Sequence, residues 1–142
     1  MKIDLDREKI EEILPHRDPF LFVDGVTSIN VGQNVEGFLN VNETKSFLSG
    51  EVSDRCLSTA ILMEAMAQVG AILVLYPMDQ RCRTIYFRSI KNAQFYRRIP
   101  SGSTVRIEAR VDKIRTRMGS LYVTARVDDT IVADAMMSFA LA

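Results

Sequence analysis

The sequence predicts an α+β fold in which one long antiparallel sheet wraps around one buried central helix. An apolar run at residues 58–76 predicts the helix, and segments that alternate apolar and polar residues predict the strands. The 142 residues contain no internal repeat and no linker-like stretch rich in Pro, Gly or Ser. We therefore expect residues 1–142 to form a single domain.

The N-terminal third predicts a short helix followed by a hairpin. Asp4 or Asp6 can cap the helix, and Pro15 ends it because proline disfavours helical geometry in the preceding residue. Gly32 marks the turn of the hairpin. The expected elements, in chain order, are a helix over 6–14, strands over 20–31 and 33–41, a loop over 42–57, the helix over 58–76, and strands over 84–90, 93–97, 104–115, 121–127 and 130–140, with tight turns at 117–120 and 128–129.

The helix at 58–76 is the most distinctive element. Ser58 or Thr59 can cap it and Pro77 stops it. It is apolar on nearly every side, which is typical of a buried helix. Its length approaches that of a membrane span, but Glu64 and Gln68 would then lie inside the bilayer at a high energetic cost. The sequence therefore predicts no membrane span.

The later strands have one apolar and one charged face, which is typical of an antiparallel sheet with one side in water. In residues 104–115, for example, Val105, Ile107 and Ala109 alternate with charged side chains. Only the central helix is apolar enough to cover this sheet. A helix that is apolar all round needs contacts on more sides than one curved sheet supplies. We therefore expect a second chain to help bury it, in a homodimer or a higher oligomer.

The composition excludes several classes of protein. Eighteen basic residues cancel eighteen acidic ones, which argues against a dedicated nucleic-acid binder. Two cysteines without CxxC spacing and a single His predict neither a disulfide scaffold nor a metal site. No phosphate-binding glycine loop is present, and no cofactor is expected. Residues 1–8 contain no apolar run, so we expect no secretory signal and a cytoplasmic location.

Charge is unevenly distributed along the chain. Residues 1–54 carry five basic and eleven acidic side chains, whereas residues 55–117 carry twelve basic and four acidic ones. The basic middle includes Lys91, Arg97 and Arg98. A local basic surface can steer an acidic partner even when the net charge is zero. Alternatively, these side chains only solvate the wet side of the strands.

Two polar residues inside the apolar helix are candidates for chemistry. Glu64 and Gln68 are four residues apart and share one face of the helix. Burial against an apolar wall disfavours the charged form of a carboxyl group and can prepare it for proton transfer. Glu64 is therefore either a catalytic or substrate-contacting group, or a brace for the preceding loop. His16 follows the first helix, where bonding to the last helical carbonyls is the expected role.

Three segments, read together, resemble one family. Residues 13–24 read ILPHRDPFLFVD, residues 62–68 read LMEAMAQ, and residues 90–102 read IKNAQFYRRIPSG. These motifs resemble the hot-dog-fold 3-hydroxyacyl-[acyl-carrier-protein] dehydratases of bacterial fatty acid synthesis. The match covers nearly the whole chain in the same order.

The resemblance implies a dimer that binds a phosphopantetheine-linked acyl chain of an acyl-carrier protein in a tunnel between the subunits. In the family, a His in a "GHFP" loop of one subunit acts with the helix Glu of the other, which matches Glu64. Backbone N–H groups near the helix start, here at Ala60 and Ile61, polarise the thioester carbonyl. Gly50, Gln68 and Phe95 match further substrate-binding positions. The basic residues Lys91, Arg97 and Arg98 suit an acidic carrier protein.

The sequence departs from the family motif in that loop. Glu51 stands where the family has His, and the prolines of the motif are absent. Three hypotheses remain open. Glu51 and Glu64 divide the acid and base roles of a slow dehydratase; the chain is a non-catalytic acyl-carrier binder or forms a mixed dimer with a His-bearing paralogue; or Glu64 serves a hot-dog thioesterase.

Overall fold

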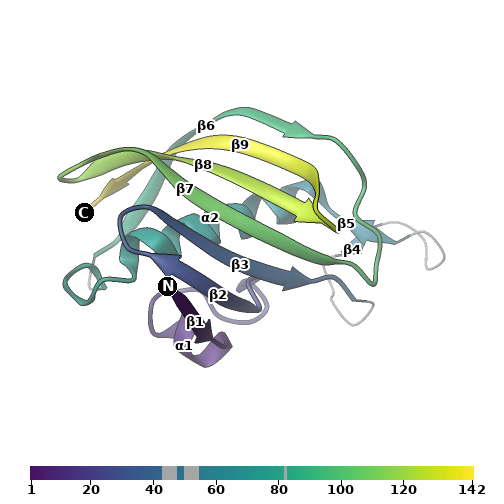
Figure 1. The fold of residues 1–142 in the computed structure, drawn as a ribbon, viewed down its shortest axis with the longest axis horizontal. Coiled ribbons are helices and arrows are strands. Elements are labelled where there is room, and N and C mark those ends of the chain that lie inside the picture. The colour runs from purple at the N-terminus through teal and green to yellow at the C-terminus, as the bar shows by residue number, and fades with distance from the viewer. Residues whose placement is uncertain (43–47, 50–54, 82) are drawn as a thin grey trace.

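The predicted α+β fold is confirmed: a long antiparallel sheet packs on one central helix (Figure 1). The computed structural model describes residues 1–42, 48–49, 55–81 and 83–142, with the side chains of all of these except 48 and 49. The elements are β1 (Lys2–Leu5), α1 (Arg7–Glu11), β2 (Gly25–Asn30), β3 (Asn34–Asn40), β4 (Leu48–Ser49), β5 (Cys56–Leu57), α2 (Thr59–Leu75), a 3₁₀ turn (Met78–Gln80), β6 (Ile85–Phe95), β7 (Thr104–Arg115), β8 (Met118–Val127) and β9 (Thr130–Leu141). The large sheet has the order β1-β2-β3-β7-β8-β9-β6.

Helix α2 fills the concave side of this sheet, where it contacts β7, β3, β8 and β6. Every residue from Ala65 to Leu75 is buried. Gly70 allows the helix to approach β8 closely, because a Cβ atom there would lie 2.8 Å from Leu121 Cδ1. The absence of a side chain at Gly70 therefore allows a short distance between helix and sheet at this point.

The opposite side of α2 is covered by the chain's own N-terminal segment, residues 14–23. Leu14, Leu21, Phe22 and Val23 in this segment are all at most 5% exposed and belong to the same core as the helix. We expected a second chain to help bury this helix, but the residues from Ala65 to Leu75 are already buried within one chain. The N-terminal segment provides the apolar contacts to α2 that we expected from a partner chain.

The N-terminal elements differ from the prediction in extent. Helix α1 spans only Arg7–Glu11, and Asp6 caps it by accepting a hydrogen bond from the backbone N–H of Lys9 at 3.0 Å. The strand expected from residue 20 begins only at Gly25, because the preceding residues turn. Phe20 N–H donates to the Arg17 carbonyl at 2.7 Å. Strand β1, which pairs with β2, was not predicted.

The C-terminal half follows the predicted alternation closely. The two strands expected over 84–90 and 93–97 form one continuous strand, β6, with irregularities that Asn92 accommodates at φ 53°. The turn expected at 117–120 is shorter, since Met118 already pairs with Arg115 in the β7–β8 hairpin. Asp128 and Asp129 adopt positive φ and form the predicted turn into β9.

Strand β6 forms one edge of the sheet and pairs only with β9 among the described strands (Figure 1). Its residues from Ile90 to Phe95 are all exposed, on both faces. Exposed apolar side chains gather there and directly after it: Tyr86, Ile90, Phe95 and Tyr96. An edge strand whose last residues are exposed on both faces is suited to pairing with another chain. No helix in the described part of the chain is long and apolar enough to cross a membrane.

Candidate active site

Glu64 lies on the second turn of α2, where helix and N-terminal segment meet. Its Oε1 atom accepts a hydrogen bond from Gln68 Nε2 at 3.1 Å and lies 3.5 Å from His16 Nε2. The Glu64 side chain is 46% exposed. One chain therefore covers this carboxyl group only in part, and its predicted burial in a tunnel between two chains stays a prediction.

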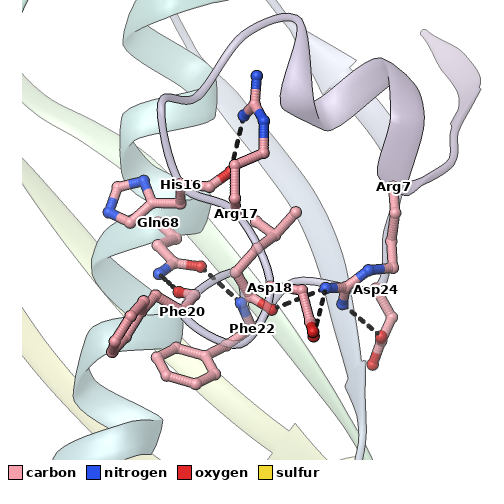
Figure 2. A network of polar contacts seen from close by, with 9 residues as sticks. Arg7, His16, Arg17, Asp18, Phe20, Phe22, Asp24 and Gln68 are labelled. Carbon is pink, nitrogen blue, oxygen red and sulfur yellow. Dashed lines mark hydrogen bonds and ion pairs between the residues drawn. The ribbon is translucent and has the colours of Figure 1, made fainter.

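Gln68 is 1% exposed and connects the helix to the N-terminal segment (Figure 2). Its Oε1 accepts a hydrogen bond from Phe22 N–H at 2.9 Å, and its Nε2 donates to the Phe20 carbonyl at 2.8 Å. The second Nε2 proton serves Glu64. The amide thus makes contacts with its own chain through both its oxygen and its nitrogen. This arrangement orients the Glu64 carboxylate relative to the loop.

His16 does not bond the last carbonyls of the first helix, so that prediction is wrong. Arg17 instead holds the segment that follows the helix, since its Nη1 donates to the carbonyls of Leu14 at 2.9 Å and of His16 at 2.8 Å. The imidazole instead faces Glu64 (31% of the His16 side chain is exposed). The sequence contains no spacing signal that links these two residues, because they belong to separate segments that meet only in the fold.

The segment that carries His16 is anchored a second time through Arg7 (Figure 2). The Arg7 guanidinium donates to Asp24 Oδ1 and to the Leu21 carbonyl, each at 3.1 Å, and lies 4.0 Å from Asp18. Asp24 Oδ2 in turn accepts the backbone N–H of Asn40 at 2.7 Å. The contacts of Arg7 and Asp24 therefore hold the backbone of residues 18–24 in place.

A cleft of about 460 Å³ opens at the other side of the helix start, between α2, β5 and the end of β6. It brings together the predicted residues Phe95, Arg97 and Arg98. Leu62 lines this cleft, but Glu64 does not. The two residues are two positions apart, so the Glu64 side chain projects about 200° around the helix axis from that of Leu62. The lining residues are Cys56, Leu57, Ser58, Thr59, Leu62, Phe95, Tyr96, Arg97, Arg98 and Ile99.

The other predicted site residues lie apart from this cleft or outside the described residues. Ala60 is exposed and Ile61 is half-buried on the first turn of α2, and Lys91 is exposed on β6. Gly50 and Glu51 lie outside the described residues, so their predicted roles stay predictions. Among the residues that are described, no group of three or more His, Cys, Asp or Glu could hold a metal ion.

Tyr96, at the rim of the cleft, belongs to a polar cluster on the outer face of the sheet. Its hydroxyl and that of Tyr122 both donate to Asp134 Oδ2, at 3.0 and 3.1 Å. The hydrogen bond to Asp134 is the main reason why the pKa of Tyr96 is raised above its usual value of 10.0. Burial is the main cause of the raised pKa of Tyr122, followed by its hydrogen bond to Asp134. The cluster joins the end of β6 to β8 and β9.

The FabA-like domain model matches residues 14–136, which include the segments just described. The chain is also 34% identical to the 3-hydroxyacyl-[acyl-carrier-protein] dehydratase FabZ of Bacillus velezensis over 138 residues, 96% of this chain and 98% of that protein. The chain belongs to the FabA-like family. The predicted family resemblance is thereby confirmed at this level.

Solved structures share the fold of this FabA-like chain. A chain of the dehydratase heterocomplex ApeI:P from Xenorhabdus doucetiae superposes with a TM-score of 0.80 at 15% identity, covering 92% of this chain and 89% of that one. The thioesterase HI1161 from Haemophilus influenzae superposes with a TM-score of 0.66 at 12% identity, covering 84% and 78%. Proteins described as dehydratase and thioesterase thus share this hot-dog architecture, and the fold alone does not distinguish the two activities.

Replacing Gln68 by Leu should destabilise this FabA-like chain by about 1–3 kcal/mol, because the buried Phe22 N–H and Phe20 carbonyl lose their partner. Gln33→Leu removes an exposed amide from the turn between β2 and β3 and serves as the matched control. Chemical denaturation measures both. Equal free energies of unfolding for the two variants would contradict the conclusion that Gln68 holds the N-terminal segment on α2.

Asp134→Asn should lower the pKa of both Tyr96 and Tyr122, since each phenol then loses its hydrogen bond to a charged acceptor. A raised pKa in the folded state stabilises the fold below pH 10, and this contribution is lost as the pH rises through the folded-state pKa. Tyrosinate absorbance during an alkaline titration reports the change, and Tyr96→Phe and Tyr122→Phe assign it. An unchanged titration curve in Asp134→Asn would refute the assignment.

Proposed function

We propose that the chain dehydrates 3-hydroxyacyl thioesters carried by an acyl-carrier protein, with Glu64 as the proton-transfer group. The observation that supports this most is the placement of Glu64. A single carboxylate stands at the start of an otherwise apolar helix, held by Gln68 and faced by His16. The membership in the FabA-like family and the 34% identity to a dehydratase of that name add to it.

The reaction requires a proton to leave C2 of the acyl chain and the hydroxyl on C3 to leave as water. A carboxylate can accept the C2 proton while the C2–H electron pair forms the C2=C3 double bond. The C3–O bond breaks, and a proton completes the departing water. Glu51 is the second carboxyl group that we assign to this exchange, on the strength of its position in the family motif. Two neighbouring carboxyl groups favour a state in which one is protonated and the other ionised.

The start of α2 offers donors for the thioester carbonyl. Ser58 makes no side-chain hydrogen bond that caps this helix. The backbone N–H groups of the first turn, including those of Ala60 and Ile61, have no acceptor within the helix. Donors of this kind stabilise the negative charge that develops on a thioester oxygen when the C2 proton leaves.

The cleft beside the helix start is the proposed entry for the carrier's phosphopantetheine arm. Its lining combines apolar side chains such as Leu62 and Phe95 with Arg97 and Arg98. Lys91 adds positive charge on the exposed end of β6. An anionic phosphate and an acidic carrier surface are complementary to this combination.

We also propose that two chains pair through β6, and that this pairing covers the partly exposed Glu64. The exposed apolar side chains of β6 and its edge, with which no other described strand than β9 pairs, support a homodimer. A higher oligomer, or a mixed dimer with a His-bearing paralogue, would use the same edge.

Glu64→Gln should lower the rate of hydration of a crotonyl thioester on acyl-carrier protein by about 10²–10⁴-fold, because the reaction loses its proton-transfer group. Glu8→Gln, an exposed acid on α1, is the matched control and should keep the wild-type rate. Glu51→Gln should also slow the reaction, and Glu51→His should retain or raise it.

Other outcomes assign other functions. Wild-type protein no faster than Glu64→Gln in hydration would contradict the dehydratase proposal. Release of free thiol from acyl-CoA in a Glu64-dependent manner would assign a thioesterase instead. Activity that appears only after co-purification with a His-bearing paralogue would assign the mixed dimer.

Wild-type protein should have the mass of at least two chains in analytical ultracentrifugation. Ile90→Lys should shift it toward the single chain, because the charge would be desolvated at the paired edge. Ile114→Lys tests the specificity of this effect, since Ile114 is also an exposed isoleucine, at 58% against 44% for Ile90, but lies on β7. Dissociation by neither variant, or by both, would argue against pairing through β6.

A further inference from the structure

His16 is the only His of the chain, and the fold places it against Glu64. Nε2 lies 3.5 Å from Glu64 Oε1. This separation is longer than an ordinary hydrogen bond, but such contacts in unliganded sites often tighten when substrate binds. The pair therefore joins an imidazole and a carboxylate within one chain.

The position of the imidazole is set by the backbone that carries it. The Arg17 guanidinium donates hydrogen bonds to the carbonyls of Leu14 and His16, and these bonds hold the backbone around His16 in place. Four residues further on, Gln68 ties the segment to α2 through Phe20 and Phe22. His16 is thus held between two anchors, at Arg17 and at Gln68 (Figure 2). Gln68 also holds Glu64 through a hydrogen bond.

The surroundings of the ring favour one tautomer. His16 Nδ1 is buried and has no hydrogen-bond partner among the described residues. A buried nitrogen without an acceptor nearby is better left as an unprotonated lone pair than as an orphaned N–H group. The proton of the neutral ring then lies on Nε2, the atom that faces the carboxylate.

The two nitrogen donors converge on one oxygen of Glu64. Gln68 Nε2 and His16 Nε2 both face Oε1. Oε2 makes no hydrogen bond or ion pair with the described residues, and the side chain is partly exposed. The carboxylate is therefore held by one oxygen, and the other is left to meet a reactant.

We propose that His16 is the positioning residue of proton transfer: its Nε2–H holds Glu64 through Oε1 so that Oε2 accepts the C2 proton of the thioester. The inference rests on the dehydratase function proposed above. In this step the C2–H pair becomes the double bond, the C3–O bond breaks, and the hydroxyl leaves as water with a proton from the acid of that proposed function. Glu64 then passes the C2 proton to that acid and returns to its ionised form. The orienting donor and the proton acceptor then come from the same subunit.

Steady-state hydration of the crotonyl carrier thioester tests this role. His16→Gln and His16→Ala should lower kcat by about 10²-fold with little change in KM, since the carboxylate loses its orientation and not its substrate. Added imidazole should partly restore the His16→Ala rate. Glu12→Gln, an exposed acid four residues before His16 and outside the anchors described above, is the control and should match the wild type.

The failure of this inference differs from the failure of the proposed function. If both His16 variants keep the wild-type kcat while Glu64→Gln is inactive, the positioning role is overturned and the dehydratase proposal stands. If the wild type itself is no faster than Glu64→Gln, both fall. Nitrogen–proton NMR of the wild-type protein needs no variant, and its single imidazole makes the assignment direct. A proton on Nδ1 of the neutral ring would overturn the inference even if the variants fail to fold.

Discussion

The arrangement of this site depends on one buried amide. Gln68 is nearly inaccessible, and a buried amide is costly unless its donors and acceptor are satisfied. Phe20, Phe22 and Glu64 supply those partners. The same three hydrogen bonds fasten the N-terminal segment across α2, complete the cover of the helix and hold the carboxylate. Core packing and site geometry are therefore coupled, and a change at Gln68 affects both.

The position of the site follows from where the cover of the helix ends. The sheet and the N-terminal segment bury α2 from Ala65 onward, whereas its first turns project toward the edge formed by β6. The uncapped N–H groups, the partly exposed Glu64 and the cleft with Arg97 and Arg98 all lie around these turns. One chain thus provides the carboxylate and the cleft at the same end of α2 but on different sides of the helix, with an edge strand suited to a second chain beside the cleft.

Because proteins with different activities share this architecture, a few side chains determine the function of this chain. Structures described as a dehydratase and a thioesterase superpose on this chain at 15% and 12% identity. At that distance only the fold is held in common, and the chemistry has to be argued from side chains. Here these are Glu64, the imidazole that faces it, and Glu51 in the loop that departs from the family motif.

The sequence by itself determined the periodic elements and the family. The apolar run predicted α2 within a residue at each end, and the period-two alternation predicted β7 without error, because both patterns record burial directly. Only the tertiary structure decided what the aperiodic N-terminal segment does. Its Leu14, Leu21 and Phe22 read as the ends of a helix and a strand, yet they cover α2. The meeting of His16 with Glu64, like the exposure of Glu64, depends on how distant segments pack. Contacts of that kind leave no spacing signal in a single chain.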